Sequence, residues 1–298
     1  MDPNPVLKKL GLATDDRVVI LHADDVGMCQ ASLIAFADLV DFGLLSSGAT
    51  MVPCPWFPAV AAYCRRQPSV DLGVHLTLTS EWELYRWGPI STRDPASGLL
   101  DEEGYLHRRS EGTQAHADSA AVQHELEAQL ARALASGIDV THVDTHMGTV
   151  ADPKFVYGYV QLALQHRLPP MIPRLDEAGW RAFGMDGEMA TLAAQFVAQL
   201  EAQGVPLIDH IIGLPLDEEP GDRLALAKRE FDALPPGLTH FVIHPAADTP
   251  ELRAITQSWR SRVADYETLR SNELRDYVRG AGIQVTGYRV LRDLMPNL

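Results

Sequence analysis

The stretch Arg17-Val18-Val19-Ile20-Leu21-His22-Ala23-Asp24-Asp25-Val26-Gly27 is the starting point for predicting the fold. Its first six residues are rich in β-branched side chains, which predicts a buried strand. Apolar side chains then recur at helical spacing from Leu33 to Val40, and Gly43 suits the end of that helix. Strand, loop and helix in this order form the basic unit of parallel α/β proteins.

The same unit recurs along the chain, which offers eight strand candidates separated by helical stretches. Asp152-Pro153 predicts the start of one of these helices, because Asp suits the N-cap and Pro the first turn. The further strand candidates are residues 49–52, 72–79, 139–144, 171–175, 206–212, 239–244 and 283–286.

This alternation predicts an α/β fold with parallel strands, arranged as an irregular (β/α) barrel. A doubly wound open sheet is the alternative. No repeat or linker divides the chain, so residues 1–298 are expected to form a single domain. Residues 83–117 break the pattern with Gly, Pro, Ser and charged residues, and we expect them to form a long surface loop near the functional site.

The composition and net charge exclude several classes of function. Of the 298 residues, 46% are hydrophobic and 22% charged, as in ordinary globular proteins, and the formal net charge is −15. Such a negative charge repels nucleic acids and anionic lipids. Cys29, Cys54 and Cys64 form no disulfide framework, and the sequence shows neither a leader nor an apolar run long enough to span a membrane. A cytoplasmic enzyme is therefore expected.

Polar residues stand where predicted strands end, the edge at which parallel α/β folds build their sites. Asp24 and Asp25 follow the first strand, and His75 lies among apolar residues of the third. Taken singly, an Asp pair is more often a solvated turn or helix cap, and a strand histidine is more often a hydrogen-bonded core residue. Neither feature alone predicts a functional site.

The stretch Thr141-His142-Val143-Asp144-Thr145-His146 gives a stronger signal, because alternate residues of a strand share one face. His244, at the end of the seventh strand candidate, would reach the same rim of the sheet. Clusters so far apart in sequence rarely coincide there by chance. A divalent metal bound by one Asp and two His, with positions open for water and substrate, accounts for them together.

With these residues assembled, the chain resembles the YdjC-like (ChbG/HpnK) carbohydrate deacetylases. The resemblance is carried by residues 21–27, by Leu72-Gly73-Val74-His75-Leu76-Thr77-Leu78-Thr79-Ser80-Glu81-Trp82, by residues 141–146 and by His244-Pro245-Ala246. It implies a distorted (β/α) barrel, a divalent metal, and hydrolysis of the acetamide of an N-acetylated amino sugar.

By matching positions, the resemblance implies specific roles for the clustered residues. Asp25, His75 and His146 would bind the metal, Asp24 would be the general base and His244 the general acid. His142 and His146 face the same way in an extended strand, so which of them ligates is open. We expect His146 to be the ligand, with His142 and Asp144 orienting the ligands.

Substrate binding is predicted from residues near the same rim. Trp82, Tyr85 and Trp87 follow the third strand and could stack on sugar rings, although loop aromatics more often pack as a lid or subunit contact. Arg174 ends the fifth strand candidate and could meet a substrate carbonyl or phosphate. An ion pair with Asp176 is the simpler expectation for it.

Several questions stay open at this level. Zinc is the expected metal, with magnesium, manganese, cobalt or nickel as alternatives. Two histidines and one carboxylate also describe the iron site of some oxygenases, and a non-catalytic carbohydrate-binding protein could keep the same scaffold. The sequence does not identify the N-acetylated sugar, and a homodimer is expected only because symmetric dimers are common.

Overall fold

A central sheet of seven strands organises the computed structural model, which describes residues 2–216 and 219–297. Its main path has the order β4-β3-β2-β1-β6-β5, β7 pairs with β1, and every one of these pairings is parallel. The predicted α/β class is therefore confirmed. The strands are β1 (Arg17–Val26), β2 (Ser47–Thr50), β3 (Leu72–Leu76), β4 (Val140–Thr145), β5 (His210–Gly213), β6 (Gly237–Ile243) and β7 (Gln284–Thr286).

Residues 169–174 connect the two edges of this sheet and give it the character of an irregular barrel. On one side Val143 of β4 donates its N–H to Pro169 and accepts a hydrogen bond from the N–H of Met171. On the other side Ile208, just before β5, exchanges backbone hydrogen bonds with Ile172 and Arg174. The segment therefore lies between β4 and the chain entering β5.

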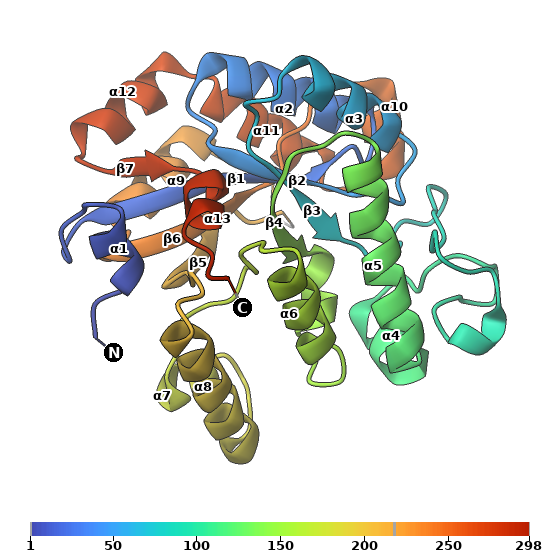
Figure 1. The fold of residues 1–298 in the computed structure, drawn as a ribbon. Coiled ribbons are helices and arrows are strands. Elements are labelled where there is room, and N and C mark those ends of the chain that lie inside the picture. Colours follow the sequence, from blue (N-terminus) through green and yellow to red (C-terminus); the bar gives the residue numbers. More distant parts are fainter. Residues whose placement is uncertain (1, 217–218, 298) are drawn as a thin grey trace.

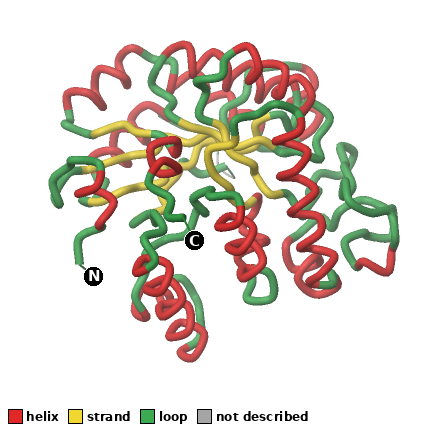
Figure 2. Tube along the Cα trace, in the orientation of Figure 1, coloured by secondary structure: helices red, strands yellow, loops and turns green. Residues whose placement is uncertain are grey.

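Helices surround the sheet, as Figures 1 and 2 show. The first six are α1 (Pro5–Lys9), α2 (Gln30–Phe42), α3 (Phe57–Arg66), α4 (Ser110–His116), α5 (Ser119–Ala135) and α6 (Val156–Gln165). The others are α7 (Glu177–Ala182), α8 (Gly187–Ala202), α9 (Arg223–Asp232), α10 (Pro250–Ile255), α11 (Trp259–Leu269), α12 (Asn272–Gly280) and α13 (Tyr288–Asp293).

Strand β1 is buried on both faces, which explains its nearly continuous apolar sequence. Val19 and Leu21 pack in the large core shared with the surrounding helices. Val18 and Ile20 belong to a second, smaller cluster with residues of α1 and α13. Because side chains alternate along a strand, His22 continues the row of Val18 and Ile20. The interior side of β1 thus changes from apolar to polar toward its carboxyl end.

Two element predictions are corrected. Residues 171–175 form no strand: Pro173 makes an isolated bridge to Ile208, and the preceding Pro170 makes one to Val143. Proline has no N–H to donate to a regular ladder, and Pro169, Pro170 and Pro173 interrupt this segment. Helix α6 begins at Val156 rather than at Asp152-Pro153. The Asp152 carboxylate accepts the N–H of Lys154 instead and closes a turn before the helix.

The loop after β3 lies at the surface and carries its own hydrogen bonds, together with a short 3₁₀ turn, Pro95–Ser97, and helix α4. Glu125 of α5 is buried and accepts the N–H groups of Ile90 (3.1 Å) and Ser91 (2.8 Å). Arg86 in the same loop pairs with Asp101 at 2.6 Å. These bonds tie the loop to α5 and to itself.

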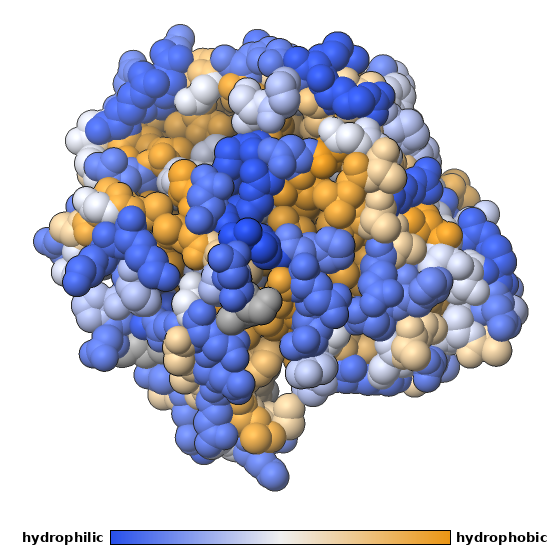
Figure 3. Space-filling view, in the orientation of Figure 1, coloured by the Kyte–Doolittle hydropathy of each residue, from blue (hydrophilic) through white to orange (hydrophobic). Residues whose placement is uncertain are grey.

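In the view of Figure 3, hydrophilic side chains cover much of the surface, and a hydrophobic patch lies at the lower tip, where Figure 1 places α7 and α8. Phe183 and Leu192 of this region are exposed. Within residues 2–216 and 219–297, no helix combines the length and the apolar composition that crossing a bilayer would need.

Candidate metal centre and active site

A cavity of about 760 Å³ opens at the carboxyl ends of β1, β3, β4 and β6. Five of the candidate residues that the sequence placed at this rim line the cavity although they come from distant parts of the chain, whereas His142 and Asp144 are not among its lining residues. The five are Asp24, Asp25, His75, His146 and His244, and Glu81, Trp82, Arg109 and Arg262 line the cavity with them.

The three predicted metal ligands meet at one point of this cavity. Asp25 Oδ1 lies 3.1 Å from His146 Nδ1 and 3.5 Å from His75 Nε2, and one ligand atom of each residue lies within 4.8 Å of the other two. Asp25 has a φ of 60°, a conformation that non-glycine residues adopt at a cost and that often marks a functional site. The backbone turn at Asp25 therefore positions its carboxylate.

The two oxygens of Asp25 have different surroundings. Oδ2 accepts a hydrogen bond of 2.8 Å from Arg262 of α11, whereas Oδ1 is buried and accepts none from the described residues. Burial alone would raise the pKa of Asp25, but the positive charge of Arg262, followed by His146, lowers it well below its usual value. A buried carboxylate oxygen without a partner fits a cation.

His75 and His146 are also oriented as metal ligands by neighbouring carboxylates. Asp144 Oδ1 lies 2.9 Å from His75 Nδ1, which leaves Nε2 of His75 directed at the cavity. Glu81 lies 3.2 Å from His146 Nε2 and leaves Nδ1 facing Asp25. Burial lowers the pKa of both histidines, but nearby carboxylates outweigh it, raising His75 well above its usual value and His146 to about 9. The carboxylates around both imidazoles therefore favour positive charge at this point.

Asp24 and His244 face each other beside this group. Asp24 Oδ1 is 2.7 Å from His22 Nδ1, and Oδ2 is 3.8 Å from His244 Nε2. Burial would raise the pKa of Asp24, but His75, His22 and His244 together lower it. Burial lowers the pKa of His244 to about 4, and its Nδ1 has no hydrogen-bond partner among the described residues. His244 is therefore neutral at pH 7, and it lines the cavity.

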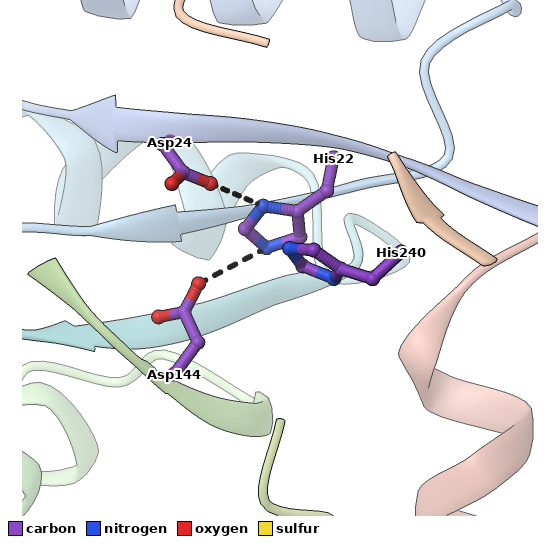
Figure 4. A group of neighbouring side chains, drawn as sticks. All are labelled: His22, Asp24, Asp144 and His240. Atoms are coloured by element: carbon purple, nitrogen blue, oxygen red, sulfur yellow. Dashed lines mark hydrogen bonds and ion pairs between the residues drawn. The ribbon is translucent and has the colours of Figure 1, made fainter. Parts of the chain in front are cut away.

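A second group of metal-type side chains lies deeper, formed by His22, Asp24, Asp144 and His240. In Figure 4 His22 stands between the two carboxylates, and it lies 3.6 Å from Asp144 Oδ2. His142 approaches this second group, with its Nε2 2.9 Å from that of His22. His146 and not His142 therefore lies with Asp25 and His75.

Comparison with known proteins identifies the family of this chain. The model of the family described as YdjC-like protein matches residues 18–280. The chain belongs to the YdjC-like family. A carbohydrate deacetylase of Thermus thermophilus is 36% identical over 91% of this chain and 92% of its own length. Another, from Thermoanaerobacter pseudethanolicus, is 22% identical over 93% of this chain and 100% of its own.

A solved structure supports the fold of this YdjC-like chain. It is a crystal structure from Enterococcus faecalis V583, of a protein described as a candidate for cellobiose-phosphate cleavage. The two share a TM-score of 0.76 at 21% identity, covering 93% of this chain and 99% of the other. At that level of identity the likeness extends to the fold alone.

Of the aromatic residues predicted to bind substrate, only Trp82 lines the cavity. Trp87 is 4% exposed and donates its Nε1–H to the backbone of Thr79, and Tyr85 donates its hydroxyl to the backbone of Met28. The rings of Trp82 and Trp87 pack at 66° with centroids 5.4 Å apart. Tyr85 and Trp87 therefore pack against Trp82 and do not line the cavity. The prediction that these two residues contact the substrate directly is corrected.

Arg174 lies away from this site, so its predicted substrate contact is corrected too. It pairs with Glu201 at 2.7 Å and with Asp209 at 3.0 Å, near Gly237, the first residue of β6. That is the amino end of the strand, whereas the site of this YdjC-like chain lies at the carboxyl ends. The simpler expectation of an ion pair was right, but the partners differ from the expected Asp176.

Sequence reasoning assigned no role to several residues of the site. Arg262 and Glu81 come from a helix and a loop where charged residues are common, so nothing in their local pattern marks them. His22 and His240 lie inside strands β1 and β6, among apolar residues. A buried histidine in each of four strands was the one available signal, since such residues need polar partners.

Proposed function

We propose that this protein is a metal-dependent hydrolase that removes the acetyl group from an N-acetylated amino sugar or oligosaccharide. The observation that carries the proposal is the buried, unpartnered Oδ1 of Asp25 facing His75 and His146 in a cavity that also contains Asp24 and His244. The deacetylase names of its relatives support the same reaction and the carbohydrate substrate.

Asp25, His75 and His146 would hold the divalent metal. Two imidazole nitrogens and one carboxylate oxygen suit zinc, and also manganese, cobalt or nickel, while magnesium requires more oxygen ligands. When bound, such a metal polarises the amide carbonyl and lowers the pKa of water. Asp144 and Glu81 contribute by fixing which nitrogen of each histidine faces the cavity.

Asp24 and His244 would move the proton. An amide nitrogen leaves only when protonated, so the proton that Asp24 takes from water has to reach that nitrogen. His244 is neutral at rest because burial lowers its pKa to about 4, and its Nε2 lies 3.8 Å from Asp24 Oδ2. His244 can therefore accept the proton from Asp24 and deliver it to the amine. Trp82, at the cavity wall, offers a flat surface for a sugar ring.

The direct test is acetate release from a panel of N-acetylated mono- and oligosaccharides, with metal-loaded protein and with protein treated with a chelator. We expect release with at least one sugar, its loss on chelation, and its recovery when metal is restored. Sugar binding without acetate release would indicate a carbohydrate-binding protein instead. Dioxygen consumption by iron-loaded protein would indicate an oxygenase.

A further inference from the structure

A row of polar side chains lies beneath the cavity and leads to Asp24, and its other members have no part in the proton transfer described above. It starts at Asp71, just before β3, and runs through Thr141 and His142 of β4 to His22 of β1. The successive distances are 2.7 Å from Asp71 Oδ1 to Thr141 Oγ1, 3.0 Å from there to His142 Nδ1, and 2.9 Å between Nε2 of His142 and of His22. The row ends at Asp24, 2.7 Å from His22 Nδ1.

The direction of these hydrogen bonds follows from the donors available. Asp71 accepts hydrogen bonds from Ser47, Thr141 and the backbone N–H of Arg289. The hydroxyl of Thr141 has a single proton, and Asp71 receives it. The oxygen of Thr141 can therefore only accept from His142, which requires the proton of His142 to sit on Nδ1.

The same reasoning extends to His22. Burial, reinforced by His22, lowers the pKa of His142 well below its usual value, so His142 is neutral and its Nε2 is an acceptor. His22 must then donate from Nε2. Its Nδ1 lies 2.7 Å from Oδ1 of Asp24, so the row of hydrogen bonds reaches Asp24 through the His22 ring.

Packing holds the His142 ring in the place that this direction requires. A Cβ atom on Gly73 would lie 2.5 Å from the ring, so only glycine at this position leaves room for it. On another side the ring of Tyr288 stacks on His142, with centroids 3.8 Å apart and planes at 16°. Both contacts fix the ring without competing for its nitrogens.

We propose that Asp71, Thr141, His142 and His22 form a positioning chain, in which the acceptor Asp71 at the amino end of the sheet fixes the ring of His22, and this ring orients Asp24 for the reaction. The functional part of this inference rests on the proposed deacetylase activity. The pair at its end is a hydrogen bond rather than a second metal site, because two ligands of one zinc ion stand about 3.3 Å apart, further than His22 Nδ1 and Asp24.

Thr141 allows a sharp test, because it lies outside the cavity lining and two close analogues of it exist. Thr141→Val keeps the shape but removes the hydroxyl, and Thr141→Ser keeps the hydroxyl. We expect Thr141→Val to lower kcat about 10-fold, as loss of an outer-shell partner commonly does, with KM and bound metal unchanged, and Thr141→Ser to restore it. Ser47→Ala is the matched control, since it removes another hydroxyl from the same oxygen of Asp71 but leaves the chain complete.

Histidine ¹⁵N NMR of the metal-loaded protein tests the chain without any substrate. The chain predicts a proton on Nδ1 and none on Nε2 for His142, and a proton on Nε2 for His22, with this pattern changed in Thr141→Val and kept in Thr141→Ser and Ser47→Ala. The opposite tautomer of His142, or an unaltered pattern and kcat in Thr141→Val, would overturn the proposal. If the wild type releases no acetate from any sugar, the proposed function fails, and the NMR pattern still decides the chain by itself.

Discussion

At the scale of single residues, the neighbours Asp24 and Asp25 have different partners, so substituting each should change metal binding and turnover differently. Asp25 faces His75 and His146, whereas Asp24 faces His22 and His244. Asp24→Asn removes the proton acceptor but none of the three proposed metal ligands. We expect it to lower kcat by about 10²–10⁴-fold, the usual contribution of a general base, and to keep stoichiometric metal.

The comparison variant is Asp25→Asn, which should lose metal and activity together. Metal content by elemental analysis and acetate release measure both effects on the same samples. Near-normal turnover of Asp24→Asn would reject its role as the base, and a full complement of metal in Asp25→Asn would remove Asp25 from the ligand set.

The sequence could predict which residue types gather at the site but not all of their contacts. Asp24, Asp25 and His75 were found because they end or lie in apolar strands, and their proximity then follows from parallel strand geometry. Their chemical roles remain predictions. Arg262 was missed because it reaches Asp25 from a helix 237 residues later, a distance in sequence that no local pattern bridges.

At the scale of elements, helix α5 anchors the loop after β3 through Glu125. Glu125→Ala would leave the partly buried N–H groups of Ile90 and Ser91 without their acceptor. We expect a loss of about 1–2 kcal/mol in the free energy of unfolding, at the lower end of the range of about 1–3 kcal/mol for a buried unsatisfied group, because water can reach these groups in part. Hydrogen exchange of the loop amides should accelerate while that of β1 stays slow.

Glu125→Gln provides the graded control, because its side chain keeps one acceptor oxygen of the two. Its effect on exchange should lie between those of the wild type and Glu125→Ala. Equal exchange at Ile90 and Ser91 in all three proteins would show that Glu125 does not hold the loop.

Element predictions succeeded where a single local rule applies and failed where two compete. Helix α2 follows from apolar spacing and ends at Gly43, whose φ of 80° suits a helix terminus. The segment 171–175 has apolar residues typical of a strand, but Pro173 and the two prolines that precede the segment prevent a ladder, so only isolated bridges form here. Asp152-Pro153 combines two helix-start signals and forms a turn instead.

At the scale of the whole molecule, buried neutral histidines make the free energy of unfolding depend on pH. Burial, followed by the charge of His22, lowers the pKa of His240 well below the ordinary value of 6.5. Below pH 6.5 the unfolded chain therefore binds a proton that the folded chain does not, so this residue makes the fold less stable as pH falls. Each such histidine contributes up to about 1.4 kcal/mol per pH unit.

His240→Gln should remove this contribution while keeping a hydrogen-bond partner for the hydroxyl of Tyr288. We expect the free energy of unfolding, measured with urea between about pH 6 and 4.5, to fall less steeply than in the wild type, by up to about 1.4 kcal/mol per pH unit. His124→Gln, on the exposed side of α5, controls for the loss of a histidine. Parallel wild-type and His240→Gln curves would contradict the prediction.

The overall architecture was predictable because alternating strands and helices leave few parallel arrangements, and the parallel sheet is confirmed. The way its edges meet was not predictable. The meeting of the edges depends on backbone hydrogen bonds from Val143 to residues 169–171 and from Ile208 to residues 172–174. Backbone hydrogen bonds of this kind leave no pattern of side chains in the sequence from which they could be predicted. The interior row of His22, His142 and His240 likewise arises only when separate strands are brought together.

The central claim is that Asp25, His75 and His146 hold one metal. Crystals of metal-loaded protein, measured on both sides of the absorption edge of that metal, locate it directly by anomalous scattering. The account predicts one strong peak per chain, within about 2.0–2.3 Å of Asp25 Oδ1 and of a nitrogen of each histidine. A peak instead at the deeper group of His22, Asp24, Asp144 and His240, or no peak in fully active protein, would contradict it.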